Sequence, residues 1–356
     1  MAADMRLLCA AVAVVVALVP ARAQQGQAGQ TGQGFSFRSN VDLINVTATV
    51  TDNAGRFVSG LTRDDFEIYE DGALQPTTFF ETERVPVSLG IVVDTSGSMV
   101  GERWVAAQAA INRFLVDLLG AQDEVFLYRF DNRPELVQPW TSDRRAASRK
   151  LSGMQPRGGT AMYDAVADAI PLAQQGTKRK KALVVISDGN DTNSRMKVNE
   201  LTRLIQESEV LVYAVGIDAS GGSGSYSQPS APQKTSRPPS PSPFPGHKVT
   251  TPPPAPAPAP TRSAPPRNSS SGGSSGDRVN ETALRAMTDD SGGRTEMIYS
   301  PQDLDPATAG IASELSQQYF LGYNSAAPKD GRWHTIEVRV KKGSYTIRAR
   351  KGFIAG

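Results

Sequence analysis

Cysteine, histidine and long apolar segments are scarce in this sequence, and each shortage excludes a class of function. The single cysteine of the 356 residues, Cys9, lies near the N-terminus, so the rest of the chain can form no disulfide and has no thiol nucleophile or zinc–thiolate site. The only two histidines, His247 and His334, stand in a proline-rich stretch and at the start of a C-terminal strand, where neither completes a Ser-His-Asp set. The net charge of +2 at pH 7 argues against a dedicated nucleic-acid-binding protein.

The N-terminal residues 1–23 have the features of a cleavable secretory signal peptide. Arg6 supplies a weak positive charge, residues 7–18 an apolar stretch, and Ala21-Arg22-Ala23 a cleavage site. An N-terminal membrane anchor is the alternative, but the apolar stretch is short for a spanning helix. No later segment is long and apolar enough to span a bilayer. Because Cys9 lies near the start of that stretch, and a lipoprotein cysteine would follow it, we expect no lipidation. The sequence predicts a secreted or periplasmic protein with no transmembrane segment after cleavage.

Two β-rich segments, 35–84 and 319–356, flank the central part of the chain. Apolar residues alternate from Ile44 to Val50 in the first and from Ile336 to Val340 in the second, as in half-buried strands. We expect a hairpin at Asp71-Gly72, between Ile68 and Phe79-Phe80, and a second one at the C-terminus, turning at residues 342–344. Since domain termini often lie close together, we predict that both segments form one small β-sandwich with the central part inserted.

The central segment, 85–318, alternates between strand and helix patterns. Its apolar runs at 87–93, 182–186 and 211–217 are typical of parallel strands buried on both faces, and helical spacing separates them. This order predicts an α/β fold, a doubly wound and mostly parallel sheet flanked by helices. Residues 219–276 hold more than half of the chain's 25 prolines and no Leu, Ile, Met or Trp, so we expect a disordered insertion there, like the Gln/Gly-rich tail at 24–34.

Three loops of this α/β segment carry hydroxyl and carboxylate side chains. In open α/β sheets, ligands bind beyond the carboxyl ends of the strands, where loops of this kind lie. Hard oxygen donors suit Mg²⁺ or Mn²⁺, and the sequence therefore predicts a metal site at that edge. The loops are Asp94-x-Ser96-x-Ser98, Gly158-Gly159-Thr160 and Ser187-Asp188-Gly189.

Each loop also has a simpler structural interpretation. Ser96 and Ser98 are suited to capping the helix that begins near Glu102, and Thr160 is suited to capping the helix that follows it. The pair Asp188-Gly189 is also suited to a plain turn. The joint occurrence of three such loops in order favours the metal site over three separate structural roles.

The three loops, in this order, resemble the metal-ion-dependent adhesion site (MIDAS) of the von Willebrand factor A (vWA) family. The flanks resemble more narrowly a secreted bacterial vWA-related family of the acidobacterial type, through residues 41–46, 64–72, 319–323 and 350–353. The resemblance covers most of residues 35–356 and implies the vWA fold, with a bound divalent cation that captures an Asp or Glu of a protein partner.

The resemblance also implies a role for each ligand. Ser96 and Ser98 would hold the cation directly, and Thr160 directly or through water. Asp94 and Asp188 would act largely through water, and Asp191 is a candidate for supporting contacts around them. An ion with few direct carboxylate ligands stays electrophilic and keeps an exchangeable water that a partner's carboxylate can replace.

Two functions remain open at this point. The first is a secreted or periplasmic adhesion-type module that binds a protein partner through Mg²⁺ or Mn²⁺, without catalysis and without nucleic acid. The second is a non-catalytic scaffold component of the cell envelope that works through its β-sandwich and through the proline-rich insertion at 219–276, which would act as a tether, and needs no metal. Loss of partner capture in EDTA would distinguish them. The sequence does not indicate an oligomeric state.

Overall fold

The computed structural model describes residues 42–188, 191–218 and 280–355. The expected signal peptide, the Gln/Gly-rich tail and the proline-rich insertion therefore lie outside the described residues. Within those ranges, no helix has the length and apolarity needed to cross a bilayer.

The centre of the α/β segment is a six-stranded sheet with the strand order β10-β9-β8-β5-β6-β7. Every neighbouring pair is parallel except β6 and β7. This arrangement confirms the predicted fold class. The strands are β5 (Val87–Asp94), β6 (Glu124–Phe130), β7 (Pro134–Thr141), β8 (Lys180–Ser187), β9 (Leu211–Ile217) and β10 (Thr295–Ile298).

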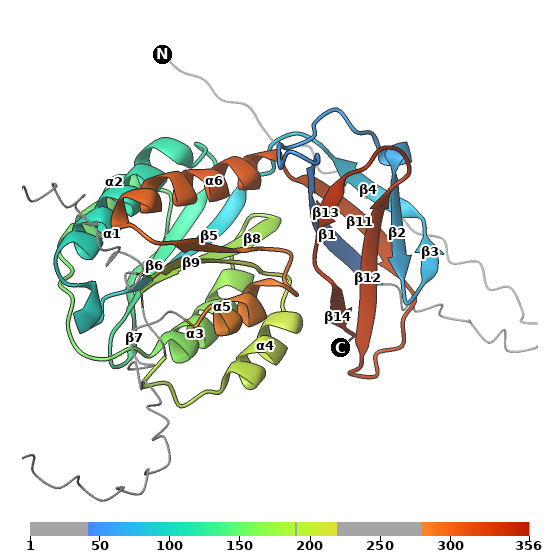
Figure 1. The fold of residues 1–356 in the computed structure, drawn as a ribbon. Helices are drawn as coiled ribbons and strands as arrows, with labels where there is room; N and C mark the ends of the chain where they lie inside the picture. The colour runs from blue at the N-terminus through green and yellow to red at the C-terminus, as the bar shows by residue number, and fades with distance from the viewer. Residues whose placement is uncertain (1–41, 189–190, 219–279, 356) are drawn as a thin grey trace, which may run out of the picture. The chain divides into compact units, whose positions relative to one another are not determined.

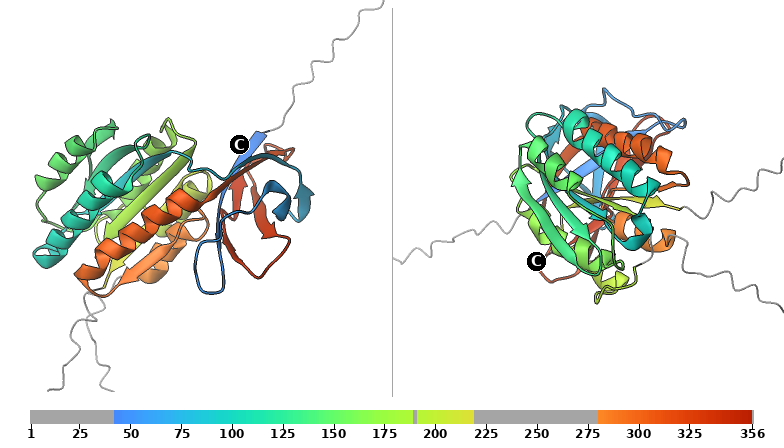
Figure 2. Two further views of the ribbon diagram at one scale, coloured as in Figure 1. Left: turned by 90° about the horizontal axis from the view of Figure 1, so that it is seen from above. Right: turned by 90° about the vertical axis from the view of Figure 1, so that its left-hand side faces the viewer.

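Helices cover both faces of this sheet (Figure 1). One face packs against α1 (Glu102–Arg113), the π-helical segment η3 (Phe114–Leu118), α2 (Arg144–Ser152) and α6 (Leu304–Gln317). The other packs against α3 (Met162–Gln174), α4 (Val198–Gln206) and α5 (Glu281–Thr288). α1 and α6 lie side by side, as the left view of Figure 2 shows. Short 3-10 helices occur at Arg63–Asp65, Gly97–Met99 and Pro301–Asp303.

Two small antiparallel sheets are built from the N- and C-terminal segments. Their orders are β13-β1-β11-β4 and β14-β12-β2-β3, so each sheet combines strands from both ends of the chain. Their apolar faces share one core, which confirms the predicted β-sandwich. The strands are β1 (Asp42–Thr51), β2 (Phe66–Glu70), β3 (Ala73–Gln75), β4 (Thr77–Glu81), β11 (Tyr319–Ser325), β12 (Trp333–Val340), β13 (Thr346–Arg348) and β14 (Gly352–Ile354).

The two predicted hairpins have different outcomes. Asp71 and Gly72 do turn the chain, with φ of 47° and 79°, as the turn of a tight hairpin requires. The returning strand is β3, however, and Phe79 and Phe80 belong to β4, which pairs with β11 in the other sheet. The expected C-terminal hairpin is wrong, because β12 pairs with β2 and β14 whereas β13 pairs with β1. Alternation determines which face of a strand is buried, but it does not determine which strand is its partner.

Gly90, in the middle of β5, provides a test of how tightly the central sheet is packed. A β-carbon at this position would lie 2.2 Å from Phe126 and 2.3 Å from Leu183, so both side chains would have to move. We expect Gly90→Ala to lower the free energy of unfolding by about 1–3 kcal/mol, measured by urea denaturation. Gly153→Ala is the control, because its added methyl would meet no atom closer than 3.6 Å. Equal stability of the two variants would contradict the prediction.

Candidate metal centre

The predicted site lies at the point where the sheet reverses its strand order. From β5 the chain continues to β6 and β7 on one side, and later strands add through β8 on the other. A crevice at such a reversal, beyond the carboxyl ends of the strands, is the usual ligand site of open α/β sheets. Asp94 is the last residue of β5, and Asp188 directly follows β8, the adjacent strand.

Asp94 is a completely buried charged residue of the site, with no exposed surface. One carboxylate oxygen accepts a hydrogen bond from the backbone N–H of Ser96 at 2.7 Å, and the other accepts one from the Ser187 hydroxyl at 2.5 Å. Burial raises the pKa of Asp94 to about 6, and the negative charge of Asp188 adds to this effect while the hydrogen bonds oppose it. The site therefore contains a carboxylate whose charge is only partly compensated by the protein.

Ser96, Ser98 and Asp188 continue this arrangement as one chain of hydrogen bonds. The Ser96 and Ser98 hydroxyl oxygens are 2.9 Å apart, and the Ser98 hydroxyl donates to Oδ1 of Asp188 at 2.7 Å. Ser98 is exposed at the mouth of the site, whereas Ser96 and Asp188 are buried. The first and third predicted loops thus meet through direct side-chain contacts.

The second loop is joined to the first through the backbone. The N–H of Gly97 donates to the carbonyl of Gly158 at 3.0 Å. Gly158 has a φ of +76°, which favours glycine, and a β-carbon there would lie 2.6 Å from Asn132. Thr160 follows as a buried residue whose hydroxyl has no hydrogen-bond partner in the described part of the chain. Among the predicted ligands, its side-chain oxygen is therefore the one that has no hydrogen bond to any described residue.

The capping roles considered from the sequence are not the ones observed. The N-cap of α1 is Gly101 and that of α3 is Ala161, and neither makes a side-chain cap. Ser96 precedes the short helix Gly97–Met99 without a capping hydrogen bond from its side chain. Gly189 lies outside the described residues, so the turn alternative at Asp188-Gly189 is not tested.

Asp191 has a different role from the supporting one expected of it. Its carboxylate accepts hydrogen bonds from the backbone N–H of Tyr163 at 3.1 Å and from the Ser194 hydroxyl at 2.6 Å. Tyr163 is in the first turn of α3, where free N–H groups and the helix dipole favour a carboxylate. Asp191 therefore stabilises the start of α3, and among the described residues it makes no hydrogen bond with Asp94 or Asp188.

Sequence reasoning missed two residues that contact the site. Arg103, in the first turn of α1, contacts Asp188, and Asn132 accepts a hydrogen bond from the N–H of Gly159 at 2.7 Å. Arg103 comes five positions after Ser98. This spacing alone does not predict a contact, because the contact depends on the start of α1 between the two residues. Asn132 follows β6, and only its position at the carboxyl end of a strand next to β5 could have indicated it.

The donor chemistry of the site is suited to a hard divalent cation. It combines the hydroxyls of Ser96, Ser98 and Thr160 with the carboxylates of Asp94 and Asp188. The described residues contain no group of three or more His, Cys, Asp or Glu side chains arranged to hold a metal. Oxygen donors without imidazole or thiolate are typical of Mg²⁺ or Mn²⁺ sites.

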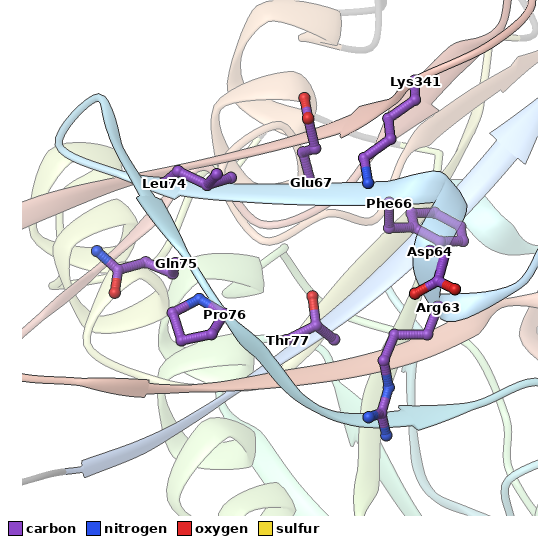
Figure 3. Close-up of a pocket in the computed structure, with 9 residues that line it drawn as sticks. All are labelled: Arg63, Asp64, Phe66, Glu67, Leu74, Gln75, Pro76, Thr77 and Lys341. Atoms are coloured by element: carbon purple, nitrogen blue, oxygen red, sulfur yellow. The ribbon is translucent and has the colours of Figure 1, made fainter.

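Two surface hollows lie apart from these five side chains. One adjoins the second loop and is lined by residues including Asn132, Arg133 and Asn193. The other lies on the small β-sheets, and Figure 3 shows the side chains around it. Its lining consists of Arg63, Asp64, Phe66, Glu67, Leu74, Gln75, Pro76, Thr77 and Lys341.

Comparison with known proteins shows which family the α/β segment resembles. Residues 89–190 match the model of the von Willebrand factor type A domain, so the protein contains a vWA domain. Inter-alpha-trypsin inhibitor heavy chain H2 of Mus musculus is 24% identical over 157 residues, which cover 39% of this chain and 16% of that protein. The chain thus matches only a small part of this relative's length.

Two solved structures are also similar. The von Willebrand factor type A protein from Catenulispora acidiphila has a TM-score of 0.45 at 13% identity and covers 90% of this chain and 74% of its own. Proximal thread matrix protein 1 of the mussel byssus, in a form described as having a zinc-occupied MIDAS motif, has a TM-score of 0.47 at 10% identity. That match covers 70% of this chain and 50% of the mussel chain.

Proposed function

We propose that this vWA-domain protein is a metal-dependent, adhesion-type module that binds an acidic side chain of a protein partner through Mg²⁺ or Mn²⁺. One observation carries the proposal: the first and third loops bring the oxygens of Ser96, Ser98 and Asp188 together at the strand-order reversal, and a backbone hydrogen bond joins the second loop to the first. The family match supports an adhesion-type module. The metal, the acidic partner and a location outside the cytoplasm are our proposals.

The five side chains divide into two roles around such an ion. Ser96, Ser98 and Thr160 provide neutral oxygen ligands, and Thr160 can do so without breaking any hydrogen bond to the described residues. Asp94 and Asp188 provide most of the negative charge that attracts a dication. A bound cation with mainly neutral direct ligands would stay electrophilic and attract a partner's carboxylate.

We propose no catalytic role for the site. vWA domains are usually non-catalytic binding modules, and we assign both carboxylates of the site, Asp94 and Asp188, to cation binding. The one histidine among the described residues, His334, is in β12, where its Nδ1 lies 2.8 Å from a carboxylate oxygen of Asp71. It is therefore engaged on the small β-sheets and does not contact the residues of the metal centre.

Replacing Thr160 by alanine tests the metal site with little disturbance of the protein. We expect the variant to bind Mg²⁺ and Mn²⁺ about tenfold more weakly in calorimetric titration, because one oxygen ligand is lost while no described hydrogen bond is. Thr202→Ala is the matched control, since that hydroxyl only contacts helix carbonyls, on Val198 and Ala286. Equal affinities in wild type, Thr160→Ala and the control would refute the assignment of Thr160, and absence of any binding in the wild type would refute the metal site.

The scaffold alternative is supported by the hollow on the small β-sheets. Leu74, one of the residues that line it, is 60% exposed and could make an apolar contact with a partner. Partner capture by the immobilised protein distinguishes the two functions. Adhesion-type capture should disappear in EDTA and return with Mg²⁺, whereas capture that survives EDTA and is lost in Leu74→Asp would support the scaffold.

A further inference from the structure

Arg103 is the only cationic side chain of the described residues that contacts either carboxylate of the metal centre. Its guanidinium donates through Nη1 to Oδ2 of Asp188 at 2.5 Å and to the backbone carbonyl of Ser98 at 2.9 Å. The side chain of Asp188 has no exposed surface, whereas that of Arg103 is 29% exposed. The arginine therefore reaches into the site from a position where it can also return to solvent.

The charges of the site explain why the protein places a cation there. Asp94 and Asp188 are both buried, at the carboxyl ends of the adjacent strands β5 and β8. A buried carboxylate without a compensating charge is strongly destabilising. Arg103 supplies one positive charge to a pair that can carry two negative ones, which leaves room for a more highly charged cation to displace it.

We propose that Arg103 is an internal counter-charge that competes with the divalent cation and thereby sets the metal affinity of the site. The inference rests on the proposed metal centre and adds its regulation. In the structure, the oxygens of Asp188 are both engaged, one by the Ser98 hydroxyl and the other by Arg103. A dication that uses Ser98 and the charge of Asp188 must separate these contacts, and it repels the guanidinium. Metal binding therefore includes the release of Arg103 from Asp188.

The proposal predicts that removing the charge of Arg103 raises the affinity for metal and lowers the stability of the metal-free protein. Without the competing guanidinium, Arg103→Gln binds Mg²⁺ and Mn²⁺ about tenfold to hundredfold more tightly, the range expected from a hydrogen bond to a charged group. In EDTA the same variant unfolds at a lower temperature than the wild type, because the buried carboxylate of Asp188 then has neither the arginine nor a metal ion beside it. Saturating Mg²⁺ removes this difference.

The experiment is calorimetric Mg²⁺ and Mn²⁺ titration of the full chain together with thermal unfolding in EDTA and in Mg²⁺. Arg103→Lys keeps the charge and retains an affinity close to that of the wild type, which separates charge from side-chain shape. Arg113→Gln is the control for α1, because Arg113 is on the same helix and forms an exposed ion pair with Asp305.

The outcomes separate this inference from the proposed function. Tighter binding in Arg103→Gln than in the wild type, with unchanged binding in Arg113→Gln, supports the inference. Equal or weaker binding in Arg103→Gln, with normal binding in the wild type, overturns the inference and leaves the metal centre intact. Absence of binding in every protein overturns both.

Discussion

Asp94→Asn is expected to abolish divalent-cation binding and, at the same time, to stabilise the metal-free protein at neutral pH. The carboxylate is fully buried, and its pKa of about 6 shows that the folded protein holds its charged form at a cost. Asparagine has the same shape, can still accept the hydrogen bond from the Ser96 N–H, and can donate one to the Ser187 hydroxyl. The variant therefore removes the charge that a cation needs and retains the packing.

The size and the pH dependence of this stabilisation follow from the pKa shift. The folded pKa of about 6 lies above the ordinary aspartate value of 3.8, so the folded state binds the proton more tightly than the unfolded state. Above pH 6 the buried charge costs about 3 kcal/mol, from roughly two pKa units, and this cost disappears as the pH falls towards 4. The advantage of Asp94→Asn over the wild type should thus be largest at pH 7–8 and small at pH 4.

Two measurements check this prediction. Urea denaturation in EDTA across pH 4–8 gives the difference in unfolding free energy between the two proteins. Titratable groups that both proteins contain contribute equally to each and cancel in this difference. Calorimetry at pH 7.5 gives metal binding. A variant that is less stable than the wild type at pH 7.5 would show that the charge of Asp94 is compensated in the protein, and a variant that still binds Mg²⁺ would exclude Asp94 from the site.

Glu314→Ala is expected to destabilise the protein by about 3 kcal/mol or more. Glu314, near the end of α6, is 1% exposed and accepts hydrogen bonds from Thr49 of β1 and Tyr213 of β9, each at 3.0 Å. It also pairs with Arg294 at 3.0 Å and with Arg348 of β13. Removing the carboxylate leaves two arginines without their shared partner, and breaking a buried pair in this way typically costs 3–5 kcal/mol.

The same helix provides the control for this prediction. Asp305→Ala removes an exposed ion pair with Arg113, and surface pairs of that kind contribute about 1 kcal/mol or less. Urea denaturation should therefore show a large shift for Glu314→Ala and a small one for Asp305→Ala. Because Glu314 joins β9 of the central sheet to β1 and β13 of a small sheet, we also expect the two parts to unfold less cooperatively in Glu314→Ala. Similar shifts in both variants would mean that the cluster contributes little beyond an exposed pair.

The role of Glu314 could not be predicted from the sequence. Its partners lie at positions 49, 213, 294 and 348, and only the tertiary structure brings them together. The same is true of Arg103, whose contact with Asp188 spans 85 positions of the sequence. Long-range polar contacts of this kind leave no periodic pattern, whereas buried strands and helices do.

The strands of the small sheets show the same limit for apolar residues. The alternation from Ile336 to Val340 correctly indicated a strand with one buried face, β12, but the predicted hairpins gave the wrong partner for β13 and for Phe79 and Phe80 of β4. In a sandwich, the strands of both sheets alternate between core-facing and outward-facing residues, so an alternating strand fits either sheet. The connections between the strands decide which sheet it joins.

What the sequence by itself determined is therefore local: the buried strands, most helices, the positive-φ turn at Asp71-Gly72, and three loops that carry hydroxyl and carboxylate side chains. The fold class followed from these elements, because alternating strands and helices have few ways to pack. Only the tertiary structure decided which strands pair in the small sheets, that the Thr160 hydroxyl has no described partner, and that Arg103 and Glu314 meet their partners. The physical reason is that hydrogen bonds and ion pairs depend on distances between residues far apart in the chain, whereas burial and turn geometry depend on residues close together in it.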